Sequence, residues 1–167
     1  PLGLLRVAAG LRLLGKEVVF LDFLEDSRMV LPSPAIPPIR RADGRRGFWK
    51  TPISKPPPLR MIPRRYHRFG AIDAWMASVL DTLPQSPDLI LIASGMTYWY
   101  HSLLHTAVLL RQKFPGVPVV IGGTAARLMP DRFEEAGLVV ERGEPFPDVS
   151  LEVVGDLLER YPVYPLQ

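Results

Sequence analysis

The chain has 167 residues, of which 47% are hydrophobic and 22% charged, and it carries a formal net charge of +3. This length allows one domain with its own core, and no apolar run approaches the roughly 20 residues of a membrane-spanning helix. The absence of cysteine excludes disulfides, thiolate metal sites and iron–sulfur ligation within these residues, and it fits a cytoplasmic protein. Because the sequence starts at Pro1 without a signal pattern, we expect it to be a segment of a longer protein.

The first residues predict a helix followed by a strand. Apolar residues recur at helical spacing between Leu4 and Leu14, and Gly15 is a typical C-terminal stop. Residues 17–22 then predict a short strand. Helix, glycine and strand form the second half of a βαβ unit, whose first strand we expect before Pro1.

Residues 25–70 break this pattern. They hold nine of the 19 prolines, and eleven Lys and Arg against three Asp and Glu give them a net charge of +8. We expect a long excursion with little regular structure, in which Trp49 and Tyr66 are among the most buried residues. Its Arg-Arg pairs could bind phosphates or nucleic acid. The aromatics are not interleaved as stacking platforms, so we favour a solvated loop or one that faces an acidic partner domain.

Alternating helices and strands follow this segment. We predict helices over 72–83, 103–114, 125–136 and 149–161, and strands over 88–93, 117–121 and 138–141. Strands separated by helical patterns of this length are typical of right-handed parallel crossovers. The sequence therefore predicts an α/β fold in which helices cover both faces of one parallel sheet, with strand 88–93 buried on both faces.

Three predicted strands end in small residues: Ser94-Gly95, Gly122-Gly123-Thr124 and Gly143-Glu144. Parallel topology brings these ends to one edge of the sheet, where α/β proteins bind ligands. We expect a groove there, with Tyr98 and Trp99 on its rim, and the amides after Thr124 could hold a phosphate. We also expect Gly122→Val to block the groove, through added volume and because β-branched residues tolerate positive φ badly. The alternative is that these glycines only ease tight turns and that the aromatics pack the helix layer.

Other chemistry-bearing residues give weaker signals. His101 and His105 could share one helix face, but no nearby Asp, Glu or Cys supplies a third metal ligand. Asp22 ends a strand and could touch a ligand or form a turn. Nothing resembles a nucleophile–base set or a catalytic carboxylate pair, so we assign neither catalytic nor metal-binding residues.

Short segments spread over nearly the whole chain carry a family resemblance: Pro1-Leu2-Gly3-Leu4-Leu5, Gly15-Lys16-Glu17-Val18, Leu21-Asp22, Ile62-Pro63-Arg64-Arg65-Tyr66-His67-Arg68-Phe69-Gly70, Met96-Thr97-Tyr98-Trp99-Tyr100, Val119-Val120-Ile121-Gly122-Gly123 and Arg142-Gly143-Glu144. With them the chain resembles the N-terminal cobalamin (B12)-binding-type domain of B12-binding radical S-adenosylmethionine (SAM) proteins. The resemblance implies a flavodoxin-like, Rossmann-like doubly wound sheet of order 2-1-3-4-5 over residues 1–167. Residues 25–70 would then be a Pro-rich basic insertion, and 162–167 the start of a linker.

The resemblance also implies a cofactor and a site. Cobalamin would bind at the carboxyl ends of the strands, with contacts from Ser94, Met96, Thr97, Tyr98, Gly122, Gly123, Thr124, Gly143 and Glu144. The radical chemistry of such proteins, with its 4Fe–4S cluster and S-adenosylmethionine, belongs to a following barrel that these residues do not include. The Asp-x-His-x-x-Gly motif that ligates cobalt in other cobalamin proteins is absent, so cobalamin would bind without that histidine.

The resemblance therefore predicts an accessory domain that positions cofactor or substrate for a C-terminal radical SAM domain of the same chain. Two alternatives stay open. The domain could be a Rossmann-like docking module that has lost B12 binding, or residues 25–70 could bind an anionic partner or nucleic acid.

Overall fold

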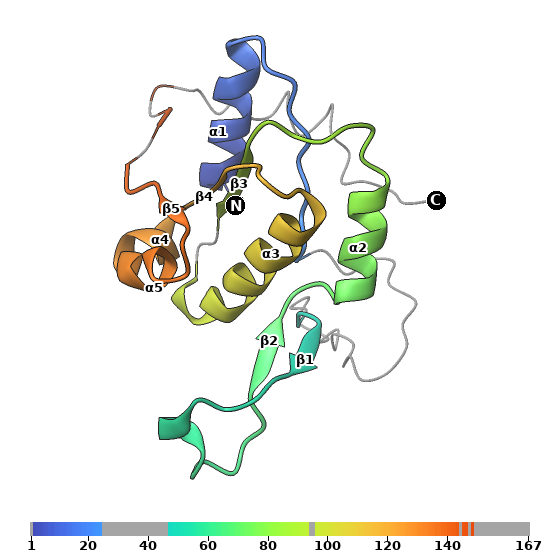
Figure 1. The fold of residues 1–167 in the computed structure, drawn as a ribbon. Coiled ribbons are helices and arrows are strands. Elements are labelled where there is room, and N and C mark those ends of the chain that lie inside the picture. The colour runs from blue at the N-terminus through green and yellow to red at the C-terminus, as the bar shows by residue number, and fades with distance from the viewer. Residues whose placement is uncertain (1, 25–46, 94–95, 144, 147, 149–167) are drawn as a thin grey trace. The chain divides into compact units, whose positions relative to one another are not determined.

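The computed structural model describes residues 2–24, 47–93, 96–143, 145–146 and 148 (Figure 1). These residues fall into two compact units, one within 1–22 and 86–167 and the other within 23–85. No helix within the described ranges is both long enough and apolar enough to cross a bilayer.

The first unit is built on a three-stranded parallel sheet. Its strands are β3 (Ile90–Ala93), β4 (Val119–Gly122) and β5 (Val139–Val140), in the order β3-β4-β5 (Figure 1). The chain returns from β3 to β4 through the helix α3 (Tyr100–Lys113). The parallel pairing of these three predicted strands confirms a mixed α/β fold.

Burial along the strands differs from the expectation in one respect. In β3, Ile90 and Ile92 are buried while Leu91 is only half-buried, and β4 shows the same alternation. An alternation of period two means that one face of each strand packs more tightly than the other. The apolar run at β3 is thus not fully buried on both faces.

The helix α1 (Leu2–Leu13) ends as predicted at Gly15, which has a φ of 74°. The segment after it is not a strand, so the strand prediction for residues 17–22 is wrong. Val18 and Phe20 instead pack against a small cluster on α1 formed by Leu5, Ala8 and Ala9. The apolar side chains of Val18 and Phe20 are thus partly buried against α1, although the segment forms no strand.

The predicted helix over 125–136 is in fact two short helices, α4 (Thr124–Leu128) and α5 (Pro130–Glu134). Met129 separates them, with φ −137° and ψ 52°. Proline has no N–H and its ring clashes with the preceding turn, so Pro130 begins a helix more readily than it continues one. The prediction of one helix overlooked this proline.

Arg111 of α3 holds the end of this helical connection. Its Nη1 donates to the carbonyl oxygen of Ala136 at 3.1 Å, and its Nη2 donates to that of Gly137. Carbonyl groups after the last turn of a helix lack partners within the helix, and a cationic side chain stabilises them. One side chain thus joins α3 to the turn that precedes β5.

The described residues of the second unit form an antiparallel ribbon, a short 3₁₀ helix and an α-helix. The ribbon pairs β1 (Lys50–Pro52) with β2 (His67–Phe69), and the 3₁₀ helix η1 (Pro57–Leu59) lies in the connection between them. The helix α2 (Asp73–Asp81) follows, within the predicted range. The ribbon itself was not predicted, because the prolines argued against strands. A two-stranded ribbon has only edge strands, which tolerate a proline such as Pro52.

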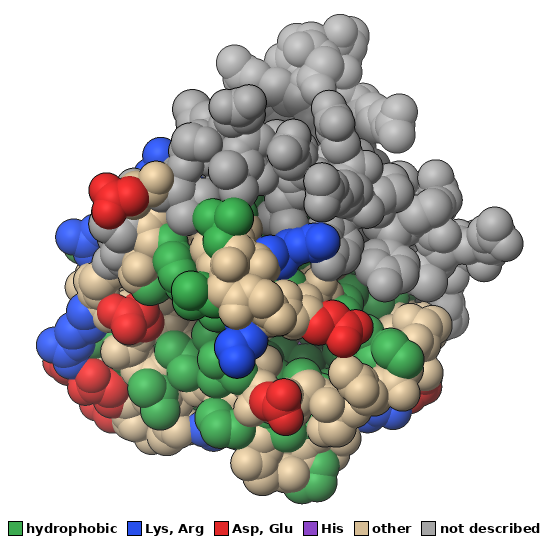
Figure 2. All heavy atoms as spheres, turned by 90° about the horizontal axis from the view of Figure 1, so that it is seen from above, with side chains coloured by type: hydrophobic (Ala, Val, Ile, Leu, Met, Phe, Trp, Pro, Cys, Tyr) green, Lys and Arg blue, Asp and Glu red, His purple; other side chains and the backbone are tan. Residues whose placement is uncertain are grey.

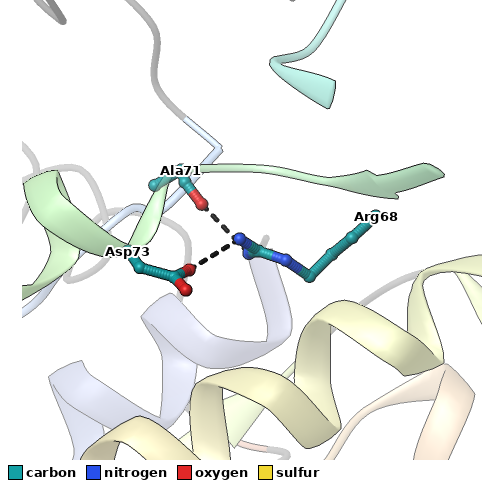
Figure 3. Close-up of polar contacts among 3 residues, drawn as sticks. All are labelled: Arg68, Ala71 and Asp73. Atoms are coloured by element: carbon teal, nitrogen blue, oxygen red, sulfur yellow. Dashed lines mark hydrogen bonds and ion pairs between the residues drawn. The ribbon is translucent and has the colours of Figure 1, made fainter. Parts of the chain in front are cut away.

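Burial in the second unit agrees with the sequence prediction for Trp49, which is buried, and less well for Tyr66, which is half-buried. The burial of one charged side chain in this unit was not expected. Arg68 of β2 is buried, and it bonds the carbonyl of Ala71 and the carboxylate of Asp73 (Figure 3).

Candidate functional site

The carboxyl ends of the three parallel strands meet at one edge of the sheet. Ala93 of β3 pairs with Gly122 of β4, and Ile121 pairs with Val140 of β5. The backbone N–H of Glu141 donates to the carbonyl of Ile121 at 2.8 Å, which extends the ladder past β5. We refer to residues 96–99, 122–124 and 141–143 as the carboxyl edge. It brings together three of the loops that the sequence analysis singled out.

The turn after β4 depends on Gly123 more than on Gly122. Gly123 is exposed and has φ 85° and ψ −172°, a conformation that is essentially restricted to glycine. Gly122 is half-buried and is not among the described residues with positive φ. The expectation of positive φ at Gly122 is therefore wrong by one residue. Thr124 is exposed and begins α4. Because α4 has only five residues, its helix dipole is too small to support the expected phosphate site.

The loop after β3 places aromatic side chains beside this turn. Ser94 and Gly95 lie outside the described residues, and the 3₁₀ helix η2 (Thr97–Trp99) follows, packed against α4 and α3. The N–H of Trp99 donates to the carbonyl of Met96 at 3.3 Å.

The side chains of this loop differ in exposure. Tyr98 is 61% exposed and Met96 is also exposed, whereas Thr97 is half-buried. The Tyr98 and Trp99 rings lie edge to face, with centroids 5.5 Å apart. An exposed ring braced against a half-buried one is a suitable wall for a flat ligand.

The loop after β5 contributes a carboxylate that the sequence analysis did not select. Glu141 Oε1 accepts a hydrogen bond from the N–H of Gly143 at 2.6 Å. A Cβ built on Gly122 would lie 3.8 Å from Glu141 Cβ, which is ordinary contact. Glu141 therefore flanks the end of β4. Its position as the last residue of the predicted strand 138–141 was the signal that could have identified it. Glu144, which was selected, lies outside the described residues.

The neighbouring Arg142 forms an ion pair with Glu134. Its Nη2 lies 2.5 Å from Glu134 Oε1, and both side chains are exposed. The hydrogen bond to Glu134 raises the pKa of Arg142, so the guanidinium stays charged at any physiological pH. A solvent-exposed pair of this kind adds little stability.

The histidines of α3 lie next to the carboxyl edge in the sequence. His101 is half-buried, and its ring lies 3.8 Å from that of Tyr100, tilted by 35°. Burial lowers the pKa of His101, which favours the neutral imidazole near pH 7. Within the described ranges, no group of three or more His, Asp or Glu residues could hold a metal ion.

The carboxyl edge offers exposed backbone at glycines, two threonine hydroxyls, one carboxylate and an aromatic rim. These groups can hold an elongated polar ligand through hydrogen bonds and stacking. Comparison with protein-family models, with curated proteins and with solved structures found no match.

Proposed function

We propose that the chain is the cobalamin-binding-type domain of a B12-binding radical SAM protein and that the carboxyl edge receives the cofactor. The observation that carries this proposal is the register of β3, β4 and β5. It brings Gly122, Gly123 and Gly143 to one edge, beside the aromatic η2. In open parallel sheets that edge is where ligands bind.

The proposal includes the finer fold, a doubly wound, flavodoxin-like sheet of order 2-1-3-4-5. The observed order β3-β4-β5 then corresponds to its last three strands.

The residues at the carboxyl edge fit the proposed ligand. Among the described residues beyond its chain neighbours, only Glu141 has atoms within 4 Å of a Cβ built on Gly122, at 3.8 Å, which is ordinary contact. Gly123 and Gly143 are exposed and have no side chain, so an elongated group can approach their backbone closely. Thr97 and Thr124 can exchange hydrogen bonds with its polar atoms.

The proposed site also keeps Ser94, Met96, Tyr98 and Glu144 among its contacts. Bound cobalamin would supply organometallic chemistry at cobalt, and the chain would hold and orient it. The partner is a C-terminal radical SAM domain of the same cytoplasmic protein, which carries the 4Fe–4S cluster and S-adenosylmethionine. The chain by itself then performs no catalysis.

The test uses the full-length protein, purified after cobalamin supplementation and examined by ultraviolet–visible absorption. We expect cobalamin bands in the wild type and their loss in Gly122→Val, with an unchanged melting transition. Gly3→Val is the matched control, because a Cβ at Gly3 meets no described residue within 4 Å and Gly3 lies on α1. A wild-type protein without cobalamin would contradict the proposal and favour a docking module of the same shape. If a folded Gly122→Val variant still binds cobalamin at the wild-type stoichiometry, the carboxyl edge is not the binding site.

A further inference from the structure

The connection between β1 and β2 is an extended loop that reaches beyond the ribbon (Figure 1, teal). We call residues 53–66 the arm. The arm contains four cationic residues, no acidic residue and four prolines. On the face drawn in Figure 2, by contrast, side chains of both charges are interspersed among the described residues. The arm is thus a concentrated source of positive charge.

Internal hydrogen bonds restrict the arm. The N–H of Ile53 donates to the carbonyl of Tyr66 at 3.0 Å and closes its base. Near the tip, the N–H of Leu59 donates to the carbonyl of Pro56 at 2.9 Å, and Lys55 Nζ donates to the carbonyl of Ile62. Prolines and local bonds reduce the conformational entropy that the arm would lose on binding.

The tip of the arm exposes both apolar and cationic side chains to solvent. Met61 is 93% exposed and Ile62 is 46% exposed. The neighbouring Arg60, Arg64 and Arg65 are exposed, and among the described residues their side chains make no hydrogen bond or ion pair. Methionine and arginine are enriched in protein–protein interfaces. An exposed methionine between exposed guanidinium groups is therefore suited to a partner with carboxylates around an apolar recess.

The location and burial of the aromatic side chains distinguish between the possible classes of partner. Tyr66, at the base of the arm, is half-buried, and Trp49, at the opposite end of the ribbon, is buried. Membrane-interface segments use exposed Trp and Tyr, and single-stranded nucleic acids need aromatic platforms for stacking. The tip offers neither, so its chemistry favours a folded protein surface.

We infer that the arm docks on an acidic protein surface, with Met61 inserted into an apolar recess and Arg60, Arg64 and Arg65 paired with carboxylates around it. This docking is independent of the proposed cofactor, because the arm contains none of the residues of the carboxyl edge.

The first step of the test finds the partner. A photo-reactive benzoylphenylalanine replaces Ile62 in the full-length protein, which is irradiated in the cells that make it. Mass spectrometry then identifies the cross-linked peptide. We expect a protein peptide with acidic residues close to the cross-link. Cross-links to lipid or nucleic acid alone, or none to protein, would overturn the inference.

The second step measures binding of the purified partner by calorimetry. The triple variant Arg60→Glu/Arg64→Glu/Arg65→Glu should lose at least about tenfold in affinity, and the loss should shrink as salt rises. The variant Lys16→Glu/Lys113→Glu/Arg132→Glu changes the net charge equally outside the arm and should bind within about twofold of wild type. Equal losses in both triple variants would overturn the inference.

Two more variants and two direct probes complete the test. Met61→Ala should lose about tenfold in affinity, as expected for a truncated interface anchor, whereas Leu13→Ala, at a similarly exposed apolar residue of α1, should not. Wild-type affinity in Met61→Ala would refute the insertion of that side chain. Arm-dependent binding to phosphatidylserine-rich vesicles or to a single-stranded oligonucleotide would assign the arm to those partners instead.

Discussion

Arg68 and Asp73 form an ion pair in which one partner is buried and the other exposed. Arg68 Nη2 lies 2.7 Å from Asp73 Oδ1, with side-chain exposures of 6% and 55%. Nη1 of the same guanidinium donates to the carbonyl of Ala71 at 3.0 Å (Figure 3). Desolvation lowers the pKa of Arg68, and the charge and hydrogen bond of Asp73 oppose this shift. The pair joins the end of β2 to the first turn of α2.

Removal of Asp73 should destabilise the protein, because it leaves a buried guanidinium without its counter-charge. We expect Asp73→Ala to lower the free energy of unfolding by about 1–2 kcal/mol, a modest value since the carboxylate is half in water. Urea denaturation measures this, with Asp88→Ala as an exposed control. In Arg68→Met, which removes the buried charge, Asp73→Ala should cost much less. An equal cost in both backgrounds would refute the coupling.

Gly10 of α1 faces the ring of Phe146. A Cβ on Gly10 would lie 2.4–2.8 Å from three atoms of that ring, so the ring has to move. We expect Gly10→Ala to lower stability by about 1–3 kcal/mol through overpacking. In the Phe146→Ala background the same change should be neutral or stabilising by up to about 1 kcal/mol, because alanine favours helix.

A double-mutant cycle with thermal unfolding measures this coupling. The informative result is a change in the free energy of unfolding on Gly10→Ala that has opposite signs in the wild-type and Phe146→Ala backgrounds. If Gly10→Ala destabilises both backgrounds equally, the ring is not the cause.

The two glycines after β4 should respond differently to alanine. Gly123→Ala should destabilise by about 1–3 kcal/mol, because its backbone conformation is strained for any side chain. Gly122→Ala should stay within about 0.5 kcal/mol of wild type, since among the described residues its Cβ meets only ordinary contacts. Chemical denaturation of both variants tests this order, and a greater loss in Gly122→Ala would contradict the described turn.

His101 should make the fold sensitive to mild acid. Burial lowers the pKa of His101 in the folded chain, so the unfolded chain binds the proton more readily. This contribution to stability is fully present above the unfolded pKa of about 6.5 and is lost as the pH falls below it toward the folded value. Melting temperatures across that range should fall less steeply in His101→Gln than in wild type. Gln112→Ala, an exposed position of α3 without a titratable group, is the control and should keep the wild-type slope.

The sequence predicted the sheet of the first unit well where apolar runs end in glycine or small residues. The runs that became β3 and β4 are bounded by proline and glycine and have no helical period, so strand was the one consistent assignment. The segment 17–22 has the same local character but is no strand. A segment forms a strand only if another strand lies beside it, and the local sequence pattern does not show whether one does.

The remaining differences also have physical causes. The β1–β2 ribbon was missed because proline was treated as excluding strands, whereas edge positions such as Pro52 accept it. Burial of Arg68 depends on Asp73, a tertiary pairing without a sequence signature. At the carboxyl edge, the sequence identified the glycines but not which one needs positive φ, and Glu141 was missed because its contact with Gly143 arises only in the folded loop.

The contact between Gly10 and Phe146 joins residues that lie on either side of the second unit in the sequence. During synthesis α1 leaves the ribosome long before its partners, while residues 23–85 emerge as one continuous stretch and can fold meanwhile. Within that stretch the N–H of Ala71 donates to the carbonyl of Phe23 at 2.7 Å, and the Phe23 and Trp75 rings pack with centroids 5.9 Å apart. These contacts tie the start of the second unit to the helix near its end. Early folding of this unit would therefore shorten the effective loop that α1 must close, and lower the entropic cost of completing the first unit.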